Sequence, residues 1–123
     1  MDILIVDDDA KMVESIRIGL ESSGYHACEA LSGKQAMDQL CLEGCRIGIV
    51  VTDYLMPAMN GVDLLKAIRQ HNPFMPVILM TAYAETSTVI EAFQNYCNGF
   101  IEKPFRLDQL IAEIERVTPG LFQ

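Results

Sequence analysis

The most constraining stretch of this sequence is Ile49-Val50-Val51-Thr52-Asp53, in which a largely β-branched, mostly apolar run ends at a carboxylate. A continuous apolar run, without alternation of polarity, is typical of a parallel strand covered on both faces. Pro57 and Gly61 in the following segment indicate a loop. Ligand crevices of open parallel α/β sheets lie beyond the carboxyl ends of the strands, so we expect chemistry at Asp53. Taken alone, Asp53 could equally be a residue that only starts a turn.

The rest of the chain repeats this strand-then-helix pattern over one domain, residues 1–123. Apolar runs or short mixed segments predict further strands at 3–6, 25–30, 77–80 and 100–102. Helical spacing of apolar residues predicts helices after Asp9 as far as 22–24, over 33–44, from Gly61, over 85–96, and from Leu107 as far as 118–120. Asp9 is a candidate N-cap of the first of these helices. Five strands alternating with five helices indicate an α/β fold, a (βα)5 doubly wound parallel sheet with helices on both faces.

Composition narrows the classes of partner. The formal net charge of -8 argues against nucleic-acid binding and against an anionic membrane surface, both of which require clustered Lys and Arg. The first residues contain neither a basic region nor a long apolar segment, so we read no signal peptide and no membrane span, and expect a cytoplasmic protein. Partners should be basic or apolar where they touch this chain.

The four cysteines form no paired CxxC pattern. Cys41 and Cys45 are spaced to share a helix face, which would suit a soft metal, but no further ligands cluster near them in the sequence. We therefore expect buried cysteines that act as small hydrophobes. His26 and His71 look exposed and isolated, and neither is assigned a chemical role.

Polar or charged groups follow four of the five predicted strands. They can converge only if those strands are neighbours, as in the order 2-1-3-4-5 of the flavodoxin-like doubly wound fold. Three carboxylates in one place repel one another by more than ~1 kcal/mol per pair, and a cation relieves that repulsion. Oxygen ligands suit Mg²⁺, and a lysine and a hydroxyl opposite the acids suit a phosphoryl group. The groups are Asp7 and Asp8, Asp53, Thr81 and Lys103.

Four motifs in this order resemble the receiver domains of two-component response regulators, the CheY-like family, over essentially the whole chain. The motifs are Val6-Asp7-Asp8, Asp53 with Met56-Pro57 and Gly61, Thr81-Ala82, and Lys103-Pro104-Phe105. The resemblance implies a phosphoprotein of a phosphorelay, in which Asp53 accepts a phosphoryl group from a histidine kinase or phosphotransfer protein. It implies a signalling switch rather than an enzyme. An output domain or partner protein is implied without being specified, and a homodimer is a further candidate assembly.

The resemblance also implies a magnesium site. Asp8 and Asp53 would bind Mg²⁺ directly with the backbone carbonyl of Leu55, and Asp7 would contribute through water. Asp7, Asp8 and Asp53 belong to the motifs that match the family, and Leu55 lies two residues after Asp53.

Thr81 and Lys103 would bind the phosphoryl oxygens, and Thr81 and Phe100 would form the switch. The Lys103-Pro104 bond is expected in cis, at a cost of ~0.5–1 kcal/mol for an X-Pro bond. The chain departs from the family at Tyr96-Cys97, where a small Gly-Ala pair is usual.

Two other readings remain. A Mg²⁺-dependent aspartyl phosphohydrolase would carry a second acid two residues after its nucleophile, where this chain has Leu55. A degenerate receiver would bind partners without phosphorylation, but every acid, the threonine and the lysine are present. Leu55 and Tyr83 flank the path of attacking water in the family, and both are large and neither carries a carboxylate or an amide.

Overall fold

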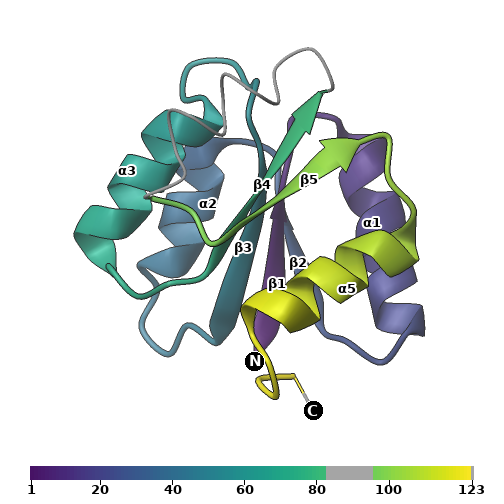
Figure 1. The fold of residues 1–123 in the computed structure, drawn as a ribbon. Helices are drawn as coiled ribbons and strands as arrows, with labels where there is room; N and C mark the ends of the chain where they lie inside the picture. Colours follow the sequence, from purple (N-terminus) through teal and green to yellow (C-terminus); the bar gives the residue numbers. More distant parts are fainter. Residues whose placement is uncertain (83–95, 123) are drawn as a thin grey trace.

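The structure is a computed structural model that describes residues 1–82 and 96–122. Five parallel strands form one sheet in the order β2-β1-β3-β4-β5, as Figure 1 shows. The predicted strand order and the parallel, doubly wound arrangement are therefore confirmed. The strands are β1 (Asp2–Val6), β2 (Ala27–Ala30), β3 (Ile47–Asp53), β4 (Val77–Ala82) and β5 (Gly99–Lys103).

Helices cover both faces of the sheet (Figure 1). Helices α1 (Ala10–Ser22) and α5 (Leu107–Val117) lie on one face, and α2 (Gly33–Leu40) and α3 (Gly61–His71) lie on the other. The strand side chains divide accordingly, since Ile3 and Ile5 pack on the α1/α5 side while Leu4 and Val6 pack on the α2/α3 side. All seven residues of β3 are buried, as its continuous apolar run predicted.

The helix predicted over 85–96 and the side chain of Tyr83 lie outside the described residues. Within residues 1–82 and 96–122, no helix has the length and apolar character needed to cross a membrane.

The second helix is shorter than predicted and ends at Leu40 instead of near Gly44. His71 of α3 explains this early end. Its Nε2 lies 3.2 Å from the Leu40 carbonyl oxygen, which can only accept, so a tertiary hydrogen bond caps the helix. His71 is exposed, but the expectation that it is isolated is wrong, because its Nδ1 also lies 3.8 Å from Cys41 Sγ.

The cysteine expectation is wrong for two of the four residues. Cys41 is the C-cap of α2 and Cys45 lies in the following loop, so they share no helix face, and both are exposed. Cys28 and Cys97 are half-buried against the α2/α3 core, where burial raises the pKa of each thiol to about 11. These two match the expected small hydrophobes more closely.

Candidate functional site

The candidate site lies at the carboxyl edge of the sheet, where four neighbouring strands end side by side. Asp7 follows β1, and Asp53 is the last residue of β3, which pairs with β1 through Val6 and Thr52. Asp53 is in register with Met80 of β4, one residue before Thr81. Strand β5 ends at Lys103, in register with Ala82. The parallel register therefore brings the sequence-predicted groups to one edge.

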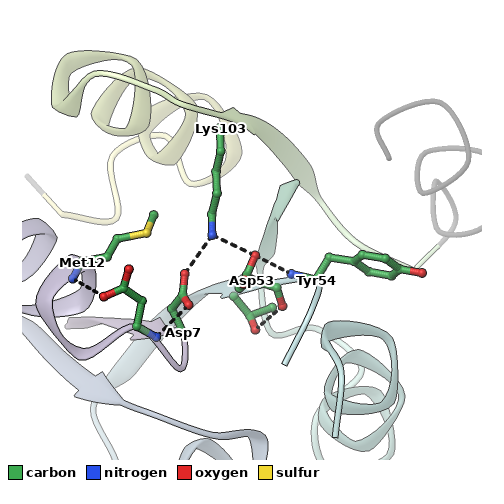
Figure 2. A network of polar contacts seen from close by, with 7 residues as sticks. Asp7, Met12, Asp53, Tyr54 and Lys103 are labelled. Atoms are coloured by element: carbon green, nitrogen blue, oxygen red, sulfur yellow. Dashed lines mark hydrogen bonds and ion pairs between the residues drawn. The ribbon is translucent and has the colours of Figure 1, made fainter. Parts of the chain in front are cut away.

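The ammonium of Lys103 joins the acids of two strands (Figure 2). Its Nζ lies 2.9 Å from Asp7 Oδ2 and 3.0 Å from Asp53 Oδ1. The Asp7 and Asp53 side chains are only 2% and 13% exposed. Because both acceptors are charged and largely shielded from water, these contacts are stronger than ordinary surface ion pairs.

The backbone holds the same two carboxylates in place. The Tyr54 N–H donates to Asp53 Oδ1 over 3.0 Å, so the Lys103 and Tyr54 contacts fall on the same oxygen. The Asp9 N–H donates to Asp7 Oδ1 over 3.1 Å. Asp9 itself accepts from the Met12 N–H at 3.2 Å as the N-cap of α1, which confirms its predicted role (Figure 2).

Burial and hydrogen bonding have opposite effects on the pKa of the Asp53 carboxyl. Burial raises the pKa of the Asp53 carboxyl, and the neighbouring Asp7 charge adds to this, while hydrogen bonds from Lys103 and the Tyr54 N–H act in the opposite direction. Burial alone would lower the pKa of Lys103, but its bonds to Asp7 and Asp53 outweigh that effect and raise it. Lys103 is therefore a fixed positive charge next to a carboxylate that is costly to ionise.

The acids form a group suited to a small divalent cation. One carboxylate oxygen from each of Asp7, Asp8 and Asp53 lies within 4.8 Å of the other two. Opposite ligands of an octahedral Mg²⁺ are separated by about 4.2 Å, so this spacing fits an ion that contacts the acids partly through water. The three carboxylates and the Lys103 ammonium leave a formal excess of two negative charges, which one Mg²⁺ matches. The residues present therefore fit the expected cofactor.

The remaining predicted site residues lie on β4, on β5 and in the loop after β3. Thr81 is buried near the end of β4. Phe100, which is half-buried, is in register with Leu79 of β4, so its side chain shares a sheet face with Leu79 and Thr81. Leu55 lies two residues beyond Asp53 in the loop after β3 and is 58% exposed. The Lys103-Pro104 bond is cis, as expected from the resemblance.

Sequence reasoning missed how tightly the loop after β3 returns to its own strand. The Gly61 N–H donates to the Tyr54 carbonyl over 2.8 Å. A Cβ at Gly61 would lie 2.4 Å from the Asp53 carbonyl oxygen. Ala58, at φ 66°, occupies a conformation that favours glycine, and nothing in its residue type indicates this. Gly61, at the start of α3, was the one sequence signal that the loop approaches the Asp53 backbone closely.

Comparisons with known proteins agree with this architecture. The family model for the response regulator receiver domain matches residues 3–115. Chemotaxis protein CheY of Pseudomonas aeruginosa is 38% identical over 120 residues, covering 95% of each chain. Transcriptional regulatory protein ZraR of Escherichia coli is 35% identical over 94% of this chain, but the chain spans only 26% of ZraR. It likewise spans 24% of the DNA-binding transcriptional regulator NtrC of Klebsiella pneumoniae.

Solved structures share the whole fold. A response regulator receiver domain protein from Clostridium thermocellum superposes with a TM-score of 0.85 at 28% identity, covering 94% of this chain and 92% of that one. The Francisella response regulator 1452 receiver domain gives a TM-score of 0.83 at 30% identity, covering 94% of each chain. With the family model spanning nearly all of the sheet and its helices, this chain belongs to the response regulator receiver domain family, the CheY-like receivers of two-component systems.

Proposed function

We propose that residues 1–123 form a phosphoacceptor receiver domain that takes a phosphoryl group on Asp53 from a histidine kinase or phosphotransfer protein, with Mg²⁺ as cofactor. One observation carries this proposal. The Lys103 ammonium lies 3.0 Å from Asp53 Oδ1, inside an acid group whose oxygens lie within 4.8 Å of one another. A positioned cation beside a carboxylate nucleophile is what transfer of a phosphoryl group requires.

In the transfer step, a carboxylate oxygen of Asp53 attacks phosphorus as the phosphorus–nitrogen bond of the donor phosphohistidine breaks. The imidazole leaves with that electron pair. Two donors already hold Oδ1, so we assign the attack to Oδ2. Mg²⁺, when bound by Asp8, Asp53 and the Leu55 carbonyl with Asp7 acting through water, would neutralise charge on the phosphoryl oxygens. Lys103 and Thr81 would bind those oxygens from the β4 and β5 side.

The signal would leave the site through Thr81 and Phe100. Both side chains share one face of the sheet on adjacent strands, so movement of Thr81 towards the phosphoryl group would open space that the Phe100 ring fills. Packed interiors respond in discrete steps, which makes this a two-state switch.

The phosphodonor would dock beside the nucleophile. A cavity of about 340 Å³ lies between α1 and the loop after β5, and its lining includes Met12, Ile16, Lys103 and Phe105. This lining is largely apolar but includes Lys103, which suits an amphipathic partner. We further propose that the domain acts in the cytoplasm without binding nucleic acid or membrane itself, and that its output passes to a further domain, a partner protein or a second copy.

The domain is proposed as a switch rather than an enzyme. A phosphohydrolase would need a general acid or base beside the nucleophile, and the position two residues after Asp53 is Leu55. A phosphorylation-independent binding module would not need Lys103 to be held between two buried carboxylates.

Incubation with acetyl phosphate and Mg²⁺ tests the proposal. We expect one added phosphoryl group, located on Asp53 by peptide mass spectrometry and released by hydroxylamine. Asp53→Asn should abolish loading, while Asp38→Asn, an exposed acid in a surface pair with Lys34, should load like wild type. A label on a serine, threonine or histidine would rule the proposal out.

A further inference from the structure

Strand β5 is an edge strand of the sheet, and its first residues are held from outside the sheet by α5. In a parallel strand, alternate residues direct their backbone groups away from the neighbouring strand. The Phe100 N–H is directed to Glu113 of α5, donating to Oε2 over 3.1 Å. Arg116 of the same helix donates to the Asn98 carbonyl over 3.3 Å. The backbone on both sides of Gly99 is therefore bonded to α5 side chains.

Glu113 is itself held in position by Arg116. Arg116 Nε donates to Glu113 Oε1 over 2.6 Å and its terminal nitrogen donates to Oε2 over 2.9 Å, a two-point contact that fixes the plane of the carboxylate. The Glu113 side chain is only 18% exposed, although Arg116 is 60% exposed. The Arg116 contact lowers the pKa of Glu113 first of all, and the Phe100 N–H contributes to the same effect. Glu113 is thus a charged acceptor with a defined orientation.

Gly99 allows this close approach. A Cβ at Gly99 would lie 2.6 Å from Glu113 Oε2 and 3.0 Å from Val117 Cγ2. The helix and the strand are therefore in contact at this point without an intervening side chain. An open cavity of about 820 Å³ extends along β5 and α5, and its lining includes Phe100, Lys103, Phe105 and Glu113.

We propose that Glu113 is a positioning residue of the switch: it holds the Phe100 backbone against α5, so that phosphorylation turns the ring about a fixed point. This inference rests on the proposed function and deepens it, because it names the residue that fixes the backbone of the switch aromatic. Without Glu113, the Asn98–Phe100 backbone can move together with the ring, and loading at Asp53 no longer selects one ring orientation.

The test follows the Phe100 ring in protein labelled with 4-fluorophenylalanine, with its fluorine signal assigned by Phe100→Leu. The ratio of the two ring states is measured before and after loading with acetyl phosphate and Mg²⁺, and loading is measured separately by intact mass. We expect Glu113→Ala to load fully but to reduce the loading-dependent change in this ratio at least about fivefold, the lower end of typical coupling. Glu113→Gln, whose amide oxygen can still accept from Phe100, should restore much of the change. Asp38→Asn serves as the surface-charge control.

The outcomes separate the two proposals. A wild-type protein that takes no phosphoryl group would overturn both. A wild-type protein that loads and shifts its ring, with Glu113→Ala shifting equally, would overturn only the role of Glu113. If Glu113→Ala is unfolded by circular dichroism, Arg116→Gln replaces it: it leaves the carboxylate in place but unfixed, and a wild-type ring response in that variant would also overturn the inference.

Discussion

The burial of Asp53 opposes the role proposed for it, since a nucleophilic carboxylate must be ionised and this side chain is only 13% exposed. Burial raises its pKa and the neighbouring Asp7 raises it further, while Lys103 and the Tyr54 N–H reduce the rise without cancelling it. A group whose pKa is higher in the folded state stabilises the fold below its unfolded pKa, about 3.9 for Asp. That contribution is lost as the pH rises through the folded pKa. The metal-free protein therefore carries a residue that disfavours folding at neutral pH.

We expect Asp53→Asn to raise the free energy of unfolding of the metal-free protein at pH 7, because the amide removes a buried charge and leaves Lys103 paired with Asp7. Urea unfolding with a chelator present measures this. The gain should shrink as the pH falls towards 4, where the wild-type carboxyl takes up its proton. A variant that is less stable than wild type at pH 7 would show that the Lys103 contact outweighs the cost of burial.

Gly61 leaves no room for a side chain beside the Asp53 backbone. Gly61→Ala should cost about 1–3 kcal/mol, the range for forcing atoms into a packed site, because its Cβ would meet the Asp53 carbonyl oxygen at 2.4 Å. Thermal melting measures the loss, and loading of Asp53 should slow as its backbone is displaced. Gly19→Ala in α1 is the matched control, since its Cβ would meet only the flexible end of Leu107 at 2.8 Å. Equal effects of the two substitutions would contradict this reading.

At the scale of elements, the strands were the most predictable part of the chain and the end of α2 was the least. Continuous apolar runs located β1, β3 and β4 within a few residues, because a strand that is buried on both faces carries apolar side chains at nearly every position. The edge strands β2 and β5 were also located to within two residues. The end of α2 depends on His71, which lies 31 residues from Leu40 in the chain. A local pattern contains no information about such a partner, and the same holds for the bonds from Glu113 and Arg116 to β5.

His71→Ala should destabilise the protein by about 1 kcal/mol, the typical net worth of one hydrogen bond, because it removes the donor that caps α2 at Leu40. The loss should appear in urea unfolding and as faster amide exchange in the last turn of α2. His26→Ala is the control, since His26 is exposed and its described hydrogen bond uses the backbone. An equal loss of stability in both variants would mean that His71 does not act as a cap.

In the whole molecule, helices cover both faces of the sheet, and three acids gather at its carboxyl edge, where Asp8 is exposed while Asp7 and Asp53 are buried. The convergence of Asp7, Asp53, Thr81 and Lys103 could be predicted, because parallel strands all end at one edge and the motif order resembled a known family. The contacts among these residues could not, because they depend on side-chain rotamers that strand ends leave free. The cluster of Asp7, Asp8 and Asp53 nevertheless predicts that a bound cation stabilises the entire fold.

We expect millimolar Mg²⁺ to raise the melting temperature, because an ion that binds only the folded state stabilises it by about 1.4 kcal/mol at ten times its dissociation constant. Differential scanning calorimetry with and without Mg²⁺ measures this rise. Asp8→Ala should abolish most of it, since Asp8 contributes one of the three clustered oxygens. Asp38→Asn should leave it unchanged. A wild-type melting temperature that does not change on addition of Mg²⁺ would exclude the metal site.

We expect the phosphorylated state to hydrolyse slowly. Hydrolysis of the acyl phosphate needs water placed in line behind phosphorus, and Leu55 supplies a bulky side chain near Asp53 with no group to orient that water. The same argument applies to Tyr83, whose position lies outside the described residues. We therefore expect a half-life of many minutes to hours instead of seconds.

Leu55→Glu should shorten this half-life about tenfold, equivalent to about 1.4 kcal/mol in the barrier, because a carboxylate at this position can orient the attacking water. Loss of the phosphoryl group is followed by intact mass after removal of the phosphodonor. Leu42→Glu is the matched control, since Leu42 is 63% exposed where Leu55 is 58% exposed, but it lies in the loop that leads into the amino end of β3. A wild-type half-life of seconds, or equal rates in both variants, would show that water access is controlled by other residues.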